Sequence, residues 1–514
     1  MKFIKKPVSI LLIMTMIVSL FTIIPFEASA ASGVQYIERS WDDANKAVVD
    51  TEKTCTSYTL LANRSSDTLY SGWYVVDRDM TVNGRLRVSG TVNLILCDHK
   101  TLTLKSGITV LENDTLNIFG QSDIDEKGKI YAHPKDDNDD FEMKDSAVIG
   151  GTEDDPNAGN IVIHGGTLDL EAPSHEGFLT YNDAACLGGG YKGTVRSVKI
   201  FGGNVKCESP GGGAAIGGGM YGAPSNGDGI LIYGGKVDAK SYSAQGDGAA
   251  AIGGGYDSPH ASGTIRIYGG ETVAEANIGG AAIGSGEKTD SNNIVITGGS
   301  VVACAKEGAG IGSGEGGRAH GITISDAVVI AASSSGAGVG SGEKGPSNGV
   351  SISKSVVIGV SAHGGAGVGS GYKGDCGNIT ATNSALFAYS KEFKSTDQIT
   401  ADLEKMGDAN IPKLFGKEFM VQAGLSLLGG LIYFLSPDHS GAAIGGGVGG
   451  VTSIKLTDCY VKAESESYSA GIGSGEDGDF GTIEIKDSEV HVNSGDYGAA
   501  IGSGDEAENA APLQ

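Results

Sequence analysis

The sequence predicts an all-β chain that folds as a right-handed parallel β-helix, with a β-rich N-terminal cap and one partly helical insertion. The first observation is a Gly-rich phrase built around one aliphatic residue, with copies at Ile283, Ile311, Val339 and Val368 that lie 28, 28 and 29 residues apart. The second is a phrase of the form Ile-x-Ile-x-Gly-Gly-x-Val between the copies, whose alternation of apolar and polar residues has the period of a strand. No helix-period segment falls inside a repeat, so the fixed period indicates coils that stack on one another.

Residues 1–30 have the features of a signal peptide. Lys2, Lys5 and Lys6 supply a positive start, an apolar run follows over residues 8–24, and Ala28-Ser29-Ala30 matches a cleavage site. We therefore expect an extracellular protein, either secreted or associated with the cell surface.

Residues 31–150 are predicted to form an N-terminal cap and the first irregular β coils. Strand-like runs such as Trp73–Val76 and Val92–Cys97 are separated by Gly, Asn and Asp, a pattern typical of all-β segments. Asp42–Glu52 is interpreted as a short helix. A cap is expected because a solenoid exposes an unpaired sheet end at its terminus.

Regular β-helix repeats are assigned to residues 151–390 and 439–514, with an insertion at 391–438 between them. In each repeat the central aliphatic residue should point inward and stack on its equivalents about 4.8 Å apart, while the neighbouring Gly and Ala let the walls approach. Within the insertion, Asp397–Met406 has one apolar helical face, and Phe419–Leu435 is an uncharged run at the short limit for a membrane span. We expect the insertion to pack on the side of the solenoid.

Composition excludes several classes of partner. The chain of 514 residues carries a formal net charge of −25, which opposes binding to nucleic acid or to an anionic membrane. We expect no membrane partner beyond the signal peptide. The 7 cysteines contain no C-x-x-C pair, so zinc is not expected, and they are interpreted as buried small apolar residues.

The repeat phrases carry a resemblance. Gly308–Glu315 and Ile294–Val301 in tandem, together with the segment Gly72–Gln121, resemble the repeats and N-terminal module of Gly-rich β-helix surface proteins of Gram-positive bacteria. That resemblance implies an adhesin-like or carbohydrate-binding role. More distantly the sequence is similar to the pectate-lyase-like β-helices, many of which bind or cleave acidic polysaccharides.

Alignment of the repeats brings aromatic residues into one column, directly before the Gly pairs. Phe201, Tyr233 and Tyr268 should project outward on three successive coils, with Lys199 and Arg266 two residues before the first and the last. Rings in a row offer apolar faces to sugars, and flanking polar groups orient the ligand. These five residues are predicted to bind carbohydrate. The alternative is ordinary stacking that stiffens the sheet face.

A second column contains Glu287, Glu315 and Glu343, four residues after the central aliphatic position. Stacked carboxylates repel one another unless a cation or a basic residue lies between them. Ca²⁺ prefers carboxylate and backbone oxygens, so these residues are a candidate calcium site. The alternative is a solvated turn compensated by basic neighbours such as Lys288, Arg318 and Lys344.

The expected function is non-catalytic binding of a polysaccharide, a surface glycan or other host or cell-wall material. Glycoside hydrolysis needs a positioned pair of carboxylates, and no such pair stands out from the repeated ones. The residues leave catalysis open but favour a protein that is not an enzyme. A lyase or glycoside hydrolase of pectate-lyase-like type and a purely structural stalk are the two alternatives.

Overall fold

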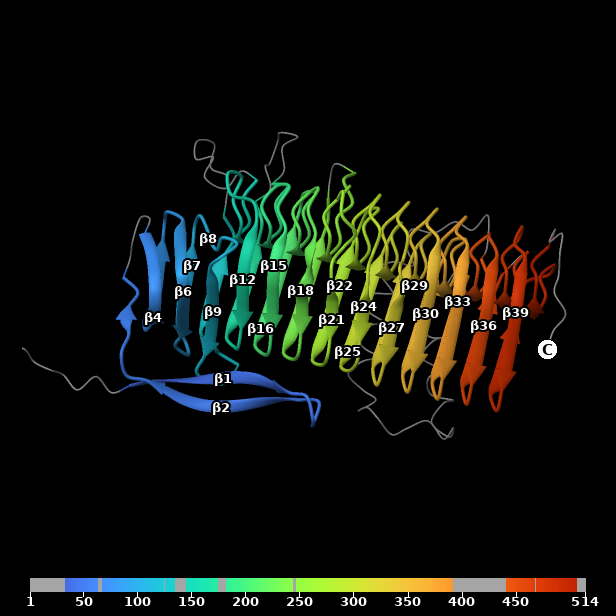
Figure 1. Cartoon of the computed structure of the whole chain (residues 1–514), viewed down its shortest axis with the longest axis horizontal. Coiled ribbons are helices and arrows are strands. Elements are labelled where there is room, and N and C mark those ends of the chain that lie inside the picture. Colours follow the sequence, from blue (N-terminus) through green and yellow to red (C-terminus); the bar gives the residue numbers. More distant parts are fainter. Residues whose placement is uncertain are drawn as a thin grey trace, which may run out of the picture.

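The computed structural model describes residues 33–62, 67–123, 125–134, 145–173, 182–243, 246–391, 441–466 and 468–505. These residues form strands and turns and contain no helix. Parallel strands stack along one long axis (Figure 1), so the predicted parallel β-helix is confirmed. The helix predicted at Asp397–Met406 and the rest of the insertion beyond Lys391 lie outside the described residues, as does the signal peptide. No helix in the described ranges is long and apolar enough to cross a membrane.

Each regular coil contributes three strands, and each strand pairs in parallel with its equivalent in the next coil. The first series holds the Gly phrase in two-residue strands: β8 (Ile108–Thr109), β11 (Ile149–Gly150), β14 (Leu187–Gly188), β17 (Ile216–Gly217), β20 (Ile252–Gly253), β23 (Ile283–Gly284), β26 (Ile311–Gly312), β29 (Val339–Gly340), β32 (Val368–Gly369), β35 (Ile444–Gly445), β38 (Ile472–Gly473) and β41 (Ile501–Gly502).

The second series holds the Ile-x-Ile phrase: β3 (Thr59–Leu60), β4 (Asp67–Val76), β6 (Leu86–Leu96), β9 (Thr115–Gly120), β12 (Ala158–Ile163), β15 (Val195–Ile200), β18 (Pro224–Ile232), β21 (Ile265–Ile267), β24 (Ile294–Ile296), β27 (Ile322–Ser325), β30 (Ser347–Ser353), β33 (Cys376–Thr382), β36 (Val451–Thr457) and β39 (Phe480–Lys486). The long strand β6 pairs with both β8 and β9, so it joins the first two series into one sheet.

The third series forms a separate sheet after the corner that follows the Ile-x-Ile phrase: β5 (Met80–Val82), β7 (Thr101–Leu104), β10 (Lys129–Ala132), β13 (Thr167–Glu171), β16 (Asn204–Ser209), β19 (Lys236–Ser241), β22 (Glu271–Ala276), β25 (Ser300–Ala305), β28 (Val328–Ser333), β31 (Val356–Ser361), β34 (Ala385–Ser390), β37 (Tyr460–Ser465) and β40 (Glu489–Asn493).

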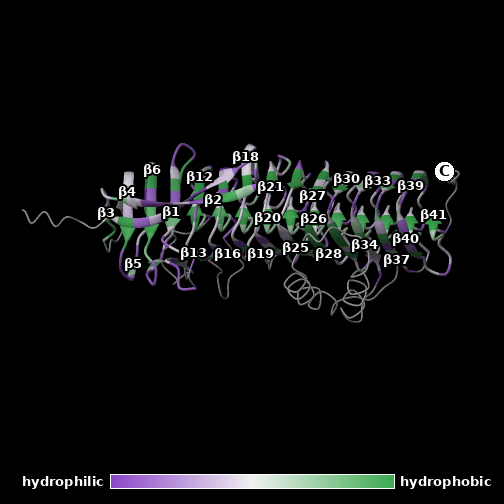
Figure 2. Cartoon of the chain, turned by 90° about the horizontal axis from the view of Figure 1, so that it is seen from below, coloured by the Kyte–Doolittle hydropathy of each residue, from purple (hydrophilic) through white to green (hydrophobic). Residues whose placement is uncertain are grey.

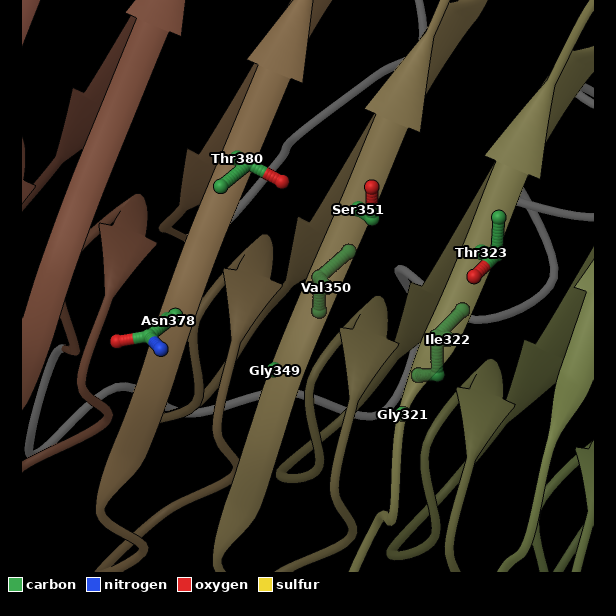
Figure 3. Close-up of a pocket in the computed structure, with 8 residues that line it drawn as sticks. All are labelled: Gly321, Ile322, Thr323, Gly349, Val350, Ser351, Asn378 and Thr380. Atoms are coloured by element: carbon green, nitrogen blue, oxygen red, sulfur yellow. The ribbon is translucent and has the colours of Figure 1, made fainter.

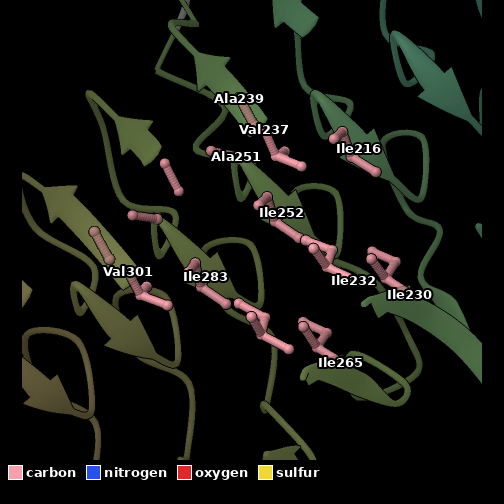
Figure 4. Packing of buried hydrophobic residues seen from close by; sticks show 14 of the residues in the cluster. Ile216, Ile230, Ile232, Val237, Ala239, Ala251, Ile252, Ile265, Ile283 and Val301 are labelled. Carbon is pink, nitrogen blue, oxygen red and sulfur yellow. The ribbon is translucent and has the colours of Figure 1, made fainter. Parts of the chain in front are cut away.

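The core is a set of aliphatic ladders inside the coils. Ile216, Ile252 and Ile283 pair in register, are fully buried and stack along the axis (Figure 4). Ile230 and Ile265 form a parallel ladder on the second series. Hydrophobic and hydrophilic residues alternate along the strands (Figure 2). Because successive side chains of a strand point to opposite faces, this alternation buries one face and leaves the other exposed.

The glycine after each central aliphatic residue is required by the backbone. Gly312 has φ +145°, and a Cβ there would overlap the carbonyl oxygen of Gly340 in the next coil. The same φ and the same clash recur at the equivalent glycines from Gly150 to Gly473, so these coils admit no side chain at this position, whereas the first coil holds Thr109 there without a left-handed φ. The phrase is therefore architectural, because only glycine fits this backbone conformation and this close contact.

The corner before the third series keeps a left-handed residue even where the glycines disappear. Gly299 has φ +77°. In the next coil the left-handed residue is Asp326, at φ 51°, which aligns with the residue just before Gly299. Lys354, Asn383, Asp458 and Asp487 take the same conformation in later coils, so four of these five residues are Asp or Asn. Asp and Asn tolerate this conformation better than most residues, so the later repeats turn without the Gly pair.

The coils continue in register across the insertion. Val368 pairs with Ile444, and Ala385–Ser390 pairs with Tyr460–Ser465. Near this point the outer face of the third series carries a second apolar cluster, which includes Cys304, Ile330, Phe387 and Tyr389, all buried.

The helix predicted at Asp42–Glu52 is wrong. These residues lie in an antiparallel hairpin of β1 (Val34–Asp42) and β2 (Ala47–Cys55), paired from Val34–Cys55 to Asp42–Ala47. The hairpin runs along the side of the solenoid, parallel to the long axis (Figure 1). Its β-branched residues suit a strand, and contacts with the coils override the weak local helix preference. The other described strands before residue 150 join the same two sheets as the repeats.

Candidate functional site

The three rings of the predicted aromatic strip are stacked. The ring centroids of Phe201 and Tyr233 lie 4.6 Å apart with planes inclined by 3°, and those of Tyr233 and Tyr268 lie 4.7 Å apart at 4°. The strip extends toward the N-terminus through His164, stacked 5.5 Å from Phe201, and Phe119, stacked 4.4 Å from His164. The column is thus an aromatic stack that spans five coils of the second series.

The hairpin β1–β2 covers much of this stack. The Trp41 ring lies 5.4 Å from Tyr233 and 5.3 Å from Tyr268, and Tyr36 lies 5.0 Å from Phe119. Tyr36, Phe119 and His164 are buried, whereas the rings of Trp41, Phe201, Tyr233 and Tyr268 stay partly exposed. The sequence analysis placed a helix at Asp42–Glu52, directly after Trp41, and therefore did not anticipate the hairpin that brings the Trp41 ring to the aromatic stack.

Arg39 anchors the hairpin to the coils. Its guanidinium is 5% exposed, forms an ion pair with Asp50 at 3.0 Å, contacts Asp123 and donates to the carbonyl oxygen of His164. The backbone of Arg39 also contacts His164 Nδ1. Burial lowers the pKa of His164, so the imidazole is held neutral under the hairpin.

An open groove of about 550 Å³ lies between the hairpin and the corner that leads to the third series. The side chains of Phe201 and Val48 form the apolar part of the groove wall. Asn204, Lys236 and Glu271 line it as a polar row, since they pair in register on successive coils. The remaining lining residues are Arg39, Asp50, Asp123, Lys127, Gly202, Gly203, Gly234, Gly235 and Gly270.

Lys199 and Arg266 lie on the outer face of β15 and β21, apart from the lining of the groove. Lys199 Nζ forms an ion pair with Asp228 at 2.8 Å, and the Arg266 charge acts on Tyr233. Burial, reinforced by neighbouring Tyr268, nevertheless raises the pKa of Tyr233. The structure therefore brings the three aromatic rings of the predicted site together. Lys199 and Arg266 lie on strands β15 and β21, outside the lining of the groove.

The column of Glu287, Glu315 and Glu343 is interleaved with lysines. Lys344 Nζ lies 2.7 Å from a Glu315 carboxylate oxygen and 2.9 Å from one of Glu343, and Lys288 Nζ lies 3.1 Å from Glu287. The hydrogen bonds with Glu315 and Glu343 raise the pKa of Lys344. Within the described ranges no three His, Cys, Asp or Glu side chains converge as a metal site requires. The geometry favours compensation by lysine over a shared calcium ion.

A second aromatic row occupies the turns after the first series. Tyr191, Tyr221 and Tyr256 are half-buried, with ring centroids 5.9 and 6.3 Å apart along the row in edge-to-face geometry. Lys288 Nζ lies 2.6 Å from the Tyr256 hydroxyl. Tyr191 and Tyr256 lie four residues after the central aliphatic residue of their repeats, the same place as Glu287, whereas Tyr221 lies five residues after Ile216.

A shallow hollow of about 260 Å³ marks the outer face of β27, β30 and β33 (Figure 3). It forms where Gly321 and Gly349 lack side chains, and Thr323, Ser351 and Thr380 point outward around it. Its lining contains no titratable side chain, so the hollow offers no acid–base chemistry.

Comparison with protein-family models matches a β-helix repeat at residues 230–256 and 294–315. Those ranges contain two copies of the Ile-x-Ile phrase and the Gly phrases that follow them. The comparisons with curated proteins and with solved structures gave no significant match.

Proposed function

We propose that this β-helix protein acts outside the cell as a non-catalytic carbohydrate-binding protein, with its site in the groove beside the hairpin β1–β2. The observation that carries the proposal is the groove itself, where an aromatic wall at Phe201 faces a polar row of Asn204, Lys236 and Glu271. Its volume of about 550 Å³ falls within the range of small-molecule sites.

The groove has the two chemical elements that a sugar needs. Phe201 and Val48 offer apolar surface to the C–H face of a sugar ring, and amide, ammonium and carboxylate groups exchange hydrogen bonds with hydroxyls. The polar row repeats once per coil, at roughly 4.8 Å. A sugar chain lying parallel to the solenoid axis would meet one polar side chain at each step, although the three differ in charge.

The charges of the groove favour a neutral ligand. Arg39 is bound by Asp50 and Asp123, so these three lining charges are already satisfied within the protein. Counted together, the lining holds three basic residues, Arg39, Lys127 and Lys236, and three acidic ones, Asp50, Asp123 and Glu271. This near balance supports binding of a neutral polysaccharide better than binding of a strongly acidic one.

The same pairing supports a non-catalytic role over a glycoside hydrolase. Hydrolysis uses two carboxyl groups free to exchange protons and attack the sugar. Here Asp50 and Asp123 both accept hydrogen bonds from Arg39 Nη2. These bonds give the two carboxylates a structural role, because they hold the hairpin against the coils.

The test is co-sedimentation of the chain with insoluble cellulose, xylan and chitin, beside a reducing-sugar and unsaturated-product assay. The parent is expected to bind at least one polymer without releasing product. The double variant Asn204→Ala, Lys236→Ala should lose that binding at an unchanged melting temperature, since both side chains are exposed.

A matched control substitutes the equivalent corner of the last described coil, Lys486→Ala with Glu489→Ala, and should keep binding. No binding by the parent, or equal binding by parent and groove variant, would contradict the proposal. Loss of binding in Tyr221→Ala alone would move the site to the second aromatic row. Product release by the parent would establish an enzyme.

A further inference from the structure

Two inward ladders of small residues face each other across the interior of the coils. One ladder holds the residue just before each central aliphatic residue, such as Gly338 and Gly367. The other holds an inward residue of the third series, such as Ala331 and Gly359, which pair in register. A Cβ on Gly338 would touch the Ala331 carbonyl oxygen, and one on Gly367 would touch that of Gly359. The two ladders are therefore in contact, which explains why later coils keep Gly and Ala there.

One coil has cysteine in both ladders. Cys186 directly precedes Leu187 of β14, and Cys207 lies in β16, in register with Ala239 and Leu170. Both side chains are fully buried in the core cluster. The same two ladder positions in a later coil are Gly367 and Ala388, which are also 21 residues apart, and a Cβ on Gly367 would lie 3.1 Å from Ala388 Cα. Cys186 and Cys207 therefore face each other across the coil, and burial together with the neighbouring Cys186 thiol raises the pKa of Cys207. Both cysteines are free thiols here.

Cys304 does not belong to this arrangement. The sequence places Cys207 and Cys304 in similar positions of their repeats, but the register aligns Cys207 with Ala303 through Ala239 and Ala274. Cys304 therefore points to the outer face of its strand, into the apolar cluster with Ile330.

We propose that Cys186 and Cys207 form a disulfide when the chain is exported. The two S–H bonds are replaced by one S–S bond, with two protons released and two electrons passed to an incoming disulfide, which is reduced to its thiols. That oxidant is a low-molecular-weight or protein disulfide of the kind found outside the reducing cytosol. Because both thiols are fully buried in the folded coil, exchange takes place during folding, before neighbouring coils cover them.

The bond would close a loop within a single coil. The loop from Cys186 to Cys207 contains β14, β15 and the start of β16. The bond would therefore link two walls of one coil at a point where they lie in contact. Loop closure restricts the unfolded chain, and we expect a higher melting temperature in the oxidised protein. The inference depends on export and is independent of the carbohydrate proposal.

The experiment uses the chain recovered from the medium of an exporting host. It is unfolded without reductant in the presence of iodoacetamide, digested with trypsin and mapped by mass spectrometry. Lys192, Arg196, Lys199 and Lys206 lie between the two cysteines, so trypsin separates them unless a bond links their peptides. The expected result is a linked Cys186–Cys207 pair, two hydrogens lighter than the sum of the reduced peptides, with Cys304 alkylated.

A second measurement compares melting with and without a reducing agent. Reductant added during unfolding should lower the melting temperature of the parent and of Cys304→Ala, and should leave that of Cys186→Ala unchanged. Alkylation of both Cys186 and Cys207 in the unreduced parent, or a bond between either of them and another cysteine, would overturn the proposal even if the variants fail to fold.

Discussion

Arg39 and His164 lie 125 residues apart in the sequence, and His164 Nδ1 lies 3.1 Å from the Arg39 backbone nitrogen and 2.9 Å from its carbonyl oxygen. The imidazole is also stacked between Phe119 and Phe201. This residue therefore links the hairpin to the aromatic stack, in a buried place where only a neutral ring is well tolerated.

The first prediction is that docking of the hairpin weakens as the solution becomes acidic. The pKa of His164 is lowered in the folded protein by burial, so the unfolded chain, with an ordinary value of about 6.5, binds the proton first. Stability is thus fully present above about pH 6.5 and is lost as the pH falls toward the depressed folded pKa. Fluorescence of Trp41 in a Trp73→Phe background measures docking, since the chain has 2 tryptophans.

The matched control is His164→Phe, which keeps an aromatic ring in the stack and removes the titrating group. Its Trp41 signal should change less than that of the parent between pH 7.5 and 5 (about the window of a histidine). An identical pH profile in both proteins would contradict the role of His164.

The second prediction concerns the glycine of the first series. Gly312→Ala should destabilise the protein by about 3 kcal/mol or more, because the new methyl overlaps the Gly340 carbonyl oxygen in a packed ladder. Gly316→Ala should cost only about 1 kcal/mol, since Gly316 has φ +72° but open space where the methyl would lie. Urea denaturation followed by circular dichroism compares the two. Equal costs would show that strain, and not contact between coils, sets the requirement for glycine.

The third prediction separates calcium from lysine at the glutamate column. With Lys344 between Glu315 and Glu343, we expect the same melting temperature in Ca²⁺ and in chelator. Lys344→Met should cost about 1 kcal/mol or less, as exposed ion pairs do. If Ca²⁺ instead raises the melting temperature of the parent, and the triple variant Glu287→Gln, Glu315→Gln, Glu343→Gln abolishes that rise, the column is a metal site.

The fourth prediction concerns removal of residues 392–438. The strand signal in circular dichroism should persist, because the ladders on either side already pair, as Val368 does with Ile444. The variant should bind a hydrophobic dye more strongly than the parent if the outer cluster around Phe387 and Tyr389 loses its cover. Substitution of both by Ser in the deletion variant should reverse the gain in dye binding. Unchanged dye binding on deletion would show that the insertion packs elsewhere.

Much of the fold follows from the sequence because the determinants of a solenoid are local and repeated. The spacing of 28 residues between Ile283 and Ile311 sets the length of one coil. The alternation in the Ile-x-Ile phrase sets which side of the strand is buried. The repeated Gly at positions such as Gly312 marks a backbone that a side chain cannot enter. The stacking of Phe201 on Tyr233 was predictable for the same reason, since residues in one column of a parallel ladder must lie about one strand spacing apart.

Contacts between segments that share no repeat were decided only by the tertiary structure. No period relates Trp41 to Tyr233, so the sequence could not show that the hairpin covers the strip, and a helix was expected there instead. Likewise, the contact of Cys186 with Cys207 depends on the cross-section of the coil, which sets the residues that meet across the interior. The repeat in the sequence determined which residues stack on one another in successive coils. The bends within each coil, and the docking of the non-repeating hairpin, decided which residues meet across the interior of a coil or on its surface.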